Sequence, residues 1–196
     1  MRGTAMRYRK GSLIGIILFL SWASLSFAED YTLQYFLSKA STKEYEPSKK
    51  EKTELLNRMN EMLEKTQQVH KNLVHAILGG EITMEYQEGK FWMAKLEEDR
   101  GSIEIGMQQL KLLKEKPNHL EGSIELYKSL RDLSVNFNAY NNMSLLSAYV
   151  GDLAPEIELW TDPVFYKLYL LPLAASRDRD MDKEPSRTKK KPVPKK

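Results

Sequence analysis

The chain has 196 residues, of which 30 are Lys or Arg, 27 are Asp or Glu and none is Cys. The lack of cysteine excludes disulfides, iron–sulfur clusters and covalently attached c-type haem, so the stability of the fold must come from packing. Residues 29–176 hold 17 basic and 23 acidic side chains, whereas a nucleic-acid-binding domain carries positive charge on a folded face. We therefore expect no nucleic acid among its partners.

The first 28 residues have the layout of a secretory signal peptide. Four basic residues precede an apolar run from Leu13 to Leu20, and Ser26 and Ala28 place small residues at the −3 and −1 positions of a cleavage site. Serines end the run well short of the about 20 apolar residues that a membrane span needs. We expect cleavage after Ala28 and a periplasmic or secreted protein. An uncleaved membrane anchor is the alternative.

A short amphipathic helix is predicted at residues 30–41, followed by three long helices whose apolar positions recur every three or four residues. The first long helix is expected over residues 47–78, the second over 82–116 and the third over 119–150. The short turns between them make neighbouring helices antiparallel. Two asparagines, Asn141 and Asn142, weaken the third helix and allow a break there.

Prolines punctuate the chain after the third long helix. Pro155 predicts a turn, and Asp162 followed by Pro163 predicts the start of a short helix that ends before Pro172. From residue 176 onward almost every side chain is charged, polar or proline, so this segment should be disordered.

The predicted fold class is all-α, an elongated antiparallel helical bundle of three long helices with short N- and C-terminal helices. The expected division is a signal peptide at residues 1–28, the bundle at 29–175 and a disordered basic tail at 176–196.

The second long helix carries a heptad seam, because its apolar positions alternate steps of four and three residues. The seam positions are Ile82, Tyr86, Gly89, Met93, Leu96, Arg100, Ile103, Met107 and Leu110. This assignment places one arginine in an otherwise largely apolar line.

Arg100 is expected to need a partner, because a buried guanidinium is costly when it is alone. An antiparallel hairpin would bring it opposite Asn60, Glu61 and Glu64. The preferred interpretation is an ion pair that fixes the register of the helices, and an anion-binding site is the alternative. The adjacent acidic run at residues 97–99 is interpreted as a solvated face.

His70 lies inside the apolar stripe of the first long helix. Cofactor and metal sites of bundles are built from such positions. A core or boundary histidine is the preferred interpretation, with a haem or metal ligand at His70 as the alternative. The main prediction includes no cofactor and no metal.

Residues 164–171 are apolar nearly all round, so this helix must be buried or must meet a partner. Burial against the bundle is the preferred interpretation. In a docking surface, the contacts would come from Phe165, Tyr166 and Tyr169.

The last ten residues carry six basic side chains and no acidic one. Such a run is attracted to anionic surfaces. A solvated tail is the preferred interpretation, and a tether to an anionic envelope surface is the alternative. The candidate contacts are Lys189, Lys190, Lys191, Lys195 and Lys196.

The sequence contains no phosphate-binding loop, nucleophile elbow or zinc-protease motif. We therefore expect a non-enzymatic exported bundle that binds another macromolecule as an adaptor or sensor module. The haem- or metal-binding bundle is the alternative function.

Overall fold

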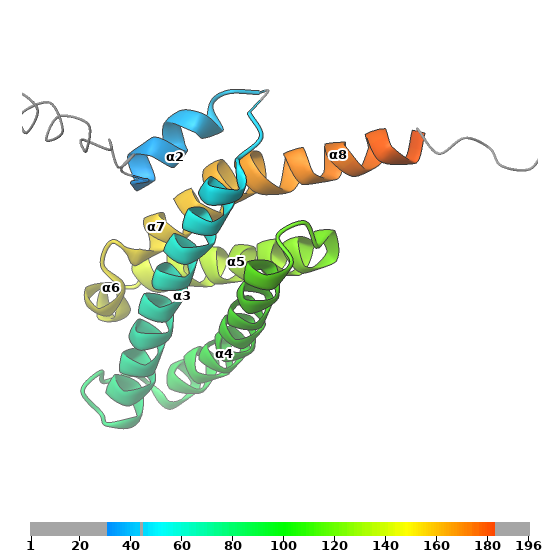
Figure 1. The fold of residues 1–196 in the computed structure, drawn as a ribbon. Coiled ribbons are helices and arrows are strands. Elements are labelled where there is room, and N and C mark those ends of the chain that lie inside the picture. Colours follow the sequence, from blue (N-terminus) through cyan, green and yellow to red (C-terminus); the bar gives the residue numbers. More distant parts are fainter. Residues whose placement is uncertain (1–30, 44, 183–196) are drawn as a thin grey trace, which may run out of the picture. The chain divides into compact units, whose positions relative to one another are not determined.

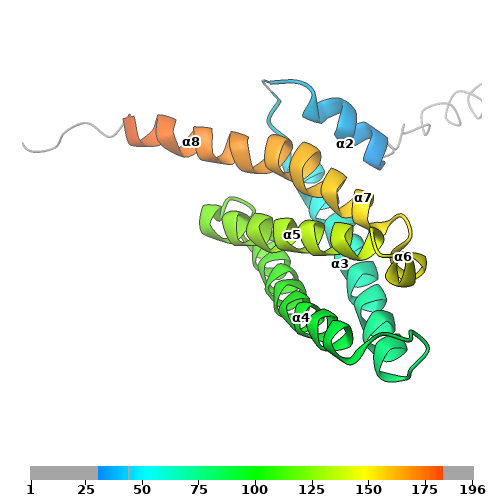
Figure 2. The ribbon, with the colours of Figure 1, turned by 180° about the vertical axis from the view of Figure 1, so that it is seen from behind.

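The structure is a computed structural model that describes residues 31–43 and 45–182. The predicted signal peptide with its cleavage site, and residues 183–196 of the predicted tail, lie outside these ranges. Within them the chain is helical almost throughout and contains no strand, which confirms the all-α prediction. Figures 1 and 2 show the helices from opposite sides.

The first described element is the short helix α2 (Leu33–Ala40), which lies near its predicted position. The hydroxyl of Thr32 caps its start by accepting a hydrogen bond from the backbone N–H of Tyr35. Phe36 is the buried residue of α2, and its ring centroid lies 5.8 Å from that of Trp160. This contact holds α2 against the C-terminal helices.

The long helix α3 (Lys49–Leu78) begins with a capping box, in which Ser48 and Glu51 satisfy each other's backbone N–H groups. The helix ends at Gly79, as the two glycines predict. Gly80 has a φ of 73°, in the region that favours glycine, and it starts the turn toward the next helix.

The helices α4 (Tyr86–Glu115) and α5 (Leu120–Asn141) follow, and α4 packs against both α3 and α5. In Figures 1 and 2, α3 and α4 form a hairpin that α5 crosses. A separate short helix, α6 (Ser144–Val150), confirms the predicted break at Asn141 and Asn142.

The predicted turn at Pro155, the predicted helix start at Pro163 and the predicted helix end before Pro172 are wrong, because the chain stays helical from residue 153 to residue 182. It forms α7 (Leu153–Leu159), the π-helix η1 (Trp160–Leu170) and α8 (Leu171–Asp182) in direct succession.

Pro155 and Pro163 are each accommodated for a local reason. Pro155 lies in the first turn of α7, where backbone N–H groups need no helical partner. Pro163 has no N–H to donate and lies inside the π-helix η1, so the departure from α-helical hydrogen bonding falls where the α-helical pattern would lose a bond. At the start of α8, the N–H of Leu171 donates to Tyr166, five residues back.

Helix α8 corrects the predicted boundary of the tail, because residues 176–182 are helical rather than disordered. Leu173 is buried and anchors the start of this helix. Extending a helix from an anchored turn adds one hydrogen bond for each residue that is fixed, which favours continuation. The hydroxyl of Ser176 also donates to the carbonyl of Leu173.

The core is centred on α5, which packs against α4 on one side and against α7 and η1 on the other. The predicted stripe of α5 is confirmed, since its members are completely buried. They are Leu126, Leu130, Leu133, Phe137 and Tyr140. Among the helices of the described ranges, none combines the length and the apolar character that a bilayer span requires.

Candidate functional site

His70 is buried in the hairpin and forms a specific contact within it. Its exposed fraction is 7%, and its Nε2 lies 2.7 Å from the carbonyl oxygen of Leu96 on α4. A ring nitrogen with this contact is not free to ligate a haem iron or a metal. In the described part of the chain, no group of three or more His, Asp or Glu side chains could hold a metal ion.

The predicted role of Arg100, a buried partner of residues on the first long helix, is wrong. Arg100 is exposed and pairs with residues of its own helix. Its guanidinium bonds the carboxylate of Glu97 and lies 3.6 Å from that of Glu104. Neither Glu61 nor Glu64 pairs with it. The buried face of α4 is rotated by one position at this point, so Arg100 reaches solvent and needs no partner on α3.

Asp99 occupies the place that the sequence analysis gave to Arg100. It is completely buried, which contradicts its assignment to a solvated face. Asn136 donates a hydrogen bond of 2.7 Å to its Oδ1, and the Tyr140 hydroxyl donates to its Oδ2. Burial raises the pKa of the Asp99 carboxyl, and these two hydrogen bonds oppose the rise only in part. Asp99 therefore joins α4 to α5 inside the core.

The aromatic segment in η1 is mainly core. Phe165 and Tyr169 are buried, with exposed fractions of 0% and 1%, so they offer no docking surface. Tyr166 is half-buried, and its ring lies 5.2 Å from that of Tyr127 on α5. The candidate contacts in the tail, from Lys189 to Lys196, lie outside the described residues.

Large apolar side chains are exposed at the turn of the α3–α4 hairpin, which we call the hairpin tip (residues 77–93). Leu78 is 71% exposed, Tyr86 80% and Phe91 54%. Figures 1 and 2 show this tip at the end of the hairpin that lies away from α2 and α8. A concentration of exposed apolar side chains is a mark of an interaction site.

The hairpin tip also contains a pocket with a volume of about 360 Å³. The residues that line it are mainly apolar. They are Ile77, Leu78, Ile82, Met84, Glu85, Tyr86, Gly89, Lys90 and Met93. Glu81, Glu85 and Glu88 lie in or beside the turn, against the single cation Lys90, so the rim of the pocket is acidic. The tip thus offers an apolar surface with negative charge around it.

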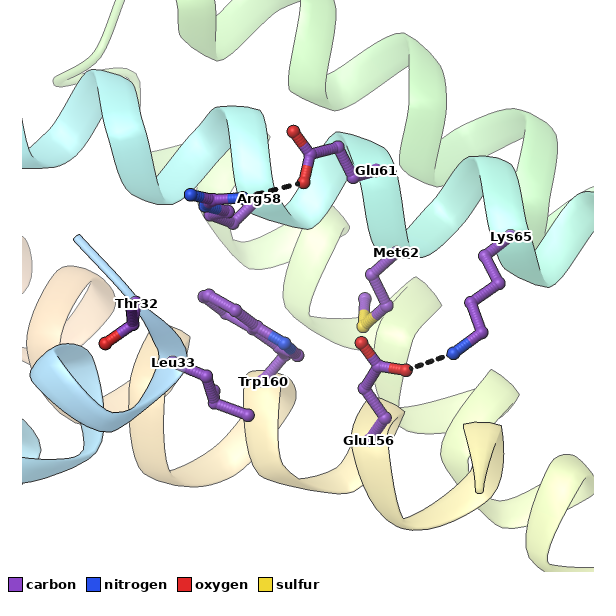
Figure 3. A pocket seen from close by; sticks show the side chains of 8 residues that line it. All are labelled: Thr32, Leu33, Arg58, Glu61, Met62, Lys65, Glu156 and Trp160. Atoms are coloured by element: carbon purple, nitrogen blue, oxygen red, sulfur yellow. Dashed lines mark hydrogen bonds and ion pairs between the residues drawn. The ribbon is translucent and has the colours of Figure 1, made fainter. Parts of the chain in front are cut away.

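A second pocket lies between α2, α3 and the start of η1, and we call it the Trp160 pocket (Figure 3). Its volume is about 410 Å³. The side chains that line it are Thr32, Leu33, Arg58, Glu61, Met62, Lys65, Glu156 and Trp160. It therefore combines an apolar floor with charged groups of both signs.

The ion pairs around the Trp160 pocket are partly exposed. Lys65 Nζ lies 2.7 Å from a carboxylate oxygen of Glu156 and joins α3 to α7. Arg58 lies 3.2 Å from both Glu54 and Glu61 on its own helix. The Nε of Arg58 is buried and forms no hydrogen bond, because the nearby Glu54 oxygen satisfies the distance of an ion pair but not the geometry of a hydrogen bond.

The indole N–H of Trp160 is the other polar group of this pocket without a partner. The side chain is only 4% exposed, and within the described residues its N–H donates no hydrogen bond. The nitrogen itself is reached by solvent, so an acceptor that enters the pocket can meet this N–H. Figure 3 shows the indole nitrogen on the side of the ring that faces Met62 and Glu156.

The sequence analysis singled out neither pocket. It placed Tyr86 in the apolar seam, although Tyr86 is the first residue of α4 and points to solvent. A signal for the Trp160 pocket exists in hindsight: Arg58, Glu61 and Lys65 follow one another at helical spacing on one face of α3. The other wall comes from residues about 100 positions later, so only the fold reveals the site.

Comparison with protein-family models, with curated protein sequences and with solved structures finds no match for this chain. The features of this chain that bear on its function are therefore the two pockets and the exposed surface of the hairpin tip.

Proposed function

We propose that this chain is an exported, non-enzymatic helical bundle that binds a partner protein through its hairpin tip, as an adaptor or sensor module. Export is supported by the layout of residues 1–28, a basic start, an apolar run and a small-residue cleavage site. The lack of catalytic motifs in the sequence supports a binding role rather than an enzymatic one.

The observation that carries the proposal is the exposure of Leu78 and Tyr86, which line the apolar pocket, together with that of Phe91 on the same hairpin tip. Each of these side chains would gain from burial, at about 25 cal/mol per Å² of apolar surface removed from water. Tyrosine and phenylalanine are also enriched at the centres of protein interfaces. Within residues 31–43 and 45–182 no element covers them, so a partner would supply the missing surface.

The charge at the tip indicates the chemistry of the partner. Three glutamates stand at residues 81, 85 and 88, against one lysine at residue 90. The partner segment is therefore expected to be apolar with basic residues at its edges, because complementary charge steers association and rejects wrong partners. An amphipathic helix with a basic polar face meets both requirements.

Site-specific photo-crosslinking in the producing cells tests the proposal. A photoreactive amino acid replaces Tyr86 in one variant and Val135 in the control, because Val135 is also exposed, at 60%, but lies on α5. We expect a discrete adduct with a second protein from position 86 and none from position 135. Identical adducts from both positions, or an adduct with the mass of two copies of this chain, would contradict the proposal.

The charged rim provides a second test with the same crosslinker. Replacing Glu81, Glu85 and Glu88 by glutamine should lower the yield of the adduct from position 86 and weaken its dependence on salt. Replacing the exposed acids Glu97, Glu98 and Glu104 in the middle of α4 is the control and should leave the yield unchanged.

A further inference from the structure

The walls of the Trp160 pocket come from two helix faces. Arg58, Met62 and Lys65 follow one another at steps of four and three residues, so α3 presents them on one side. Glu156 and Trp160 are one turn apart and face them from the junction of α7 and η1. The volume of about 410 Å³ lies within the range of roughly 300–1,000 Å³ that is usual for small-molecule sites.

Two observations distinguish this pocket from an ordinary surface depression. The first is the indole N–H of Trp160, which donates to no described residue and, although the side chain as a whole is only 4% exposed, is reached by solvent from the pocket. Among the described residues, Arg58 Nε is the side-chain nitrogen that is fully buried without a hydrogen bond. The Trp160 nitrogen is not in this state, so it is accessible from the pocket. The Trp160 N–H can therefore meet an acceptor that enters the pocket.

The second observation is the backbone at the same wall. Trp160 is the first residue of the π-helix η1, which interrupts the α-helical chain between α7 and α8. Long π-helical segments are rare, and π-type turns occur frequently at functional sites. Here the change of helix type coincides with the residue whose N–H is unpartnered.

The charges of the pocket match a molecule that carries both signs. Lys65 and Glu156 pair with side-chain exposed fractions of 54% and 32%, and Arg58 and Glu61 with 37% and 64%. Such exposed pairs contribute little and can exchange partners readily. A bound carboxylate could accept from the Trp160 N–H, in a pocket that Arg58 and Lys65 also line, and a bound ammonium group could donate to Glu156. A ligand with one charge would leave one of these partners unmatched.

We propose that the Trp160 pocket binds a small zwitterion, namely a free α-amino acid with an apolar side chain. Its carboxylate accepts the indole N–H of Trp160, and the positive charges of Arg58 and Lys65 line the same pocket. Its ammonium group bonds the carboxylate of Glu156, and its side chain lies against Leu33 and Met62. This site is separate from the hairpin tip and does not depend on the proposed docking of a partner protein there.

Fluorescence titration of the full chain tests the proposal. The sequence has three tryptophans, so the changes Trp22→Phe and Trp92→Phe leave Trp160 as the sole reporter. L-leucine should change its emission in a saturable manner. Two analogues that each lack one charged group, 4-methylpentanoate and 3-methylbutylamine, should bind at least about tenfold more weakly, a factor that corresponds to about 1.4 kcal/mol.

Calorimetric titration of the otherwise unchanged chain with L-leucine tests the assigned groups. Trp160→Phe keeps an aromatic ring but removes the N–H donor, and Glu156→Gln removes the charge that faces the ammonium group. Each change should weaken binding at least about tenfold. Glu158→Gln, an exposed change on the same helix, is the matched control and should bind L-leucine like the unchanged chain. Glu156 is partly exposed, so its variant is expected to fold.

The proposal would be overturned by any of three results. These are no saturable binding of L-leucine, L-valine, L-methionine or L-phenylalanine at millimolar concentration, equal binding of L-leucine and its singly charged analogues, or normal binding by Glu156→Gln. None of these results bears on crosslinking from position 86, so failure of this proposal and failure of the proposed function are distinguishable.

Discussion

Aromatic side chains are buried near the start of helix α3 but exposed near its far end. Near its start, Tyr31, Phe36 and Trp160 are all less than 9% exposed. At its far end, Tyr86 and Phe91 are more than half exposed. Residue type alone thus does not decide whether an aromatic side chain belongs to the core, because the decision depends on whether another element covers it.

The short helix α2 is what covers the first end. It lies on η1, and its Phe36 ring packs between those of Tyr31 and Trp160, at centroid distances of 6.2 and 5.8 Å. The buried carboxylate of Glu51 also accepts hydrogen bonds from Tyr35 and Tyr45, which ties the connection between α2 and α3 to the helix start.

At the hairpin tip, the Tyr149 hydroxyl on α6 donates a hydrogen bond of 3.3 Å to Glu81. This bond restrains the turn but leaves Leu78, Tyr86 and Phe91 uncovered. Helix α2 thus covers the aromatic side chains near the start of α3, whereas those at the hairpin tip stay exposed in the described part of the chain.

The largest expected effect separates two phenylalanines. Phe36→Ala should lower the free energy of unfolding by about 3–5 kcal/mol, because the side chain is only 1% exposed and truncation leaves a cavity. Phe91→Ala should change it by no more than about 0.5 kcal/mol, because Phe91 is 54% exposed. Urea denaturation measures both values. Similar midpoints for the two variants would show that the two ends do not differ in the way described.

The sequence predicted the helices well because apolar periodicity and glycine signals are local. It failed at the face of α4, where the predicted and observed seams share Leu96, Ile103 and Leu110 but differ between them. The observed seam uses Asp99 and Gly106, which sequence analysis passes over in favour of a longer side chain at the next position.

Contacts with neighbouring helices explain both exceptions on α4. A side chain on Gly106 would meet the hydroxyl of Ser129 at 2.9 Å and a methyl group of Leu63 at 3.0 Å, so three helices approach too closely there for any larger residue. Asp99 is tolerated because Asn136 and Tyr140 donate hydrogen bonds to it. Both reasons depend on partners about 25 to 45 positions away, which the local pattern of the sequence does not contain.

The exposed tip and the Trp160 pocket were not predicted for a related reason. A periodic pattern indicates which face of a helix is apolar, but it does not show whether a neighbour covers that face. Tyr86 fits the apolar pattern and is exposed, whereas Glu51 is charged and is buried by two tyrosines. The sequence pattern therefore predicts the helices, but it does not predict which helix faces are covered in the folded chain.

The second prediction concerns the link that holds the covered end together. Burial opposes ionisation of Glu51, but hydrogen bonds from Tyr35, Tyr45 and Ser48 outweigh it and lower the pKa from 4.5 to about 2. Glu51→Gln should therefore cost about 1–3 kcal/mol at pH 7, as is usual for hydrogen bonds to a charged group.

The sign of the pH dependence of Glu51 is fixed by its lowered pKa. The stabilisation is complete above the unfolded value near 4.5 and is lost as the pH falls toward 2. Urea midpoints between pH 6 and pH 2 should therefore converge for the unchanged chain and the Glu51→Gln variant. A difference that stays constant over this range would contradict the assignment.

The third prediction concerns Asp99 on α4. The pH dependence of stability that we expect from Asp99 is opposite in sign to that of Glu51. Burial raises the pKa of this carboxyl above its ordinary value of 3.8, against hydrogen bonds from Tyr140 and Asn136 and the attraction of His70 and Lys95. Its contribution to stability is complete below the unfolded pKa and is lost as the pH rises through the folded value. The unchanged chain should therefore lose stability relative to Asp99→Asn between pH 4 and pH 7, as measured by urea denaturation.

The smallest expected effect on stability is at the hairpin tip and bears most directly on function. Tyr86→Ser should change the free energy of unfolding by no more than about 0.5 kcal/mol, because the side chain is 80% exposed at the first position of α4. The same variant should lose most of its affinity for a partner that buries this tyrosine, because a few aromatic side chains carry much of the binding energy of an interface. Urea denaturation measures the first quantity. Crosslinking from a photoreactive group placed at Phe91 in this variant measures the second. A stable variant with an unchanged adduct would show that Tyr86 is exposed without being used, and a strongly destabilised variant would show that the tip is held by contacts within the bundle.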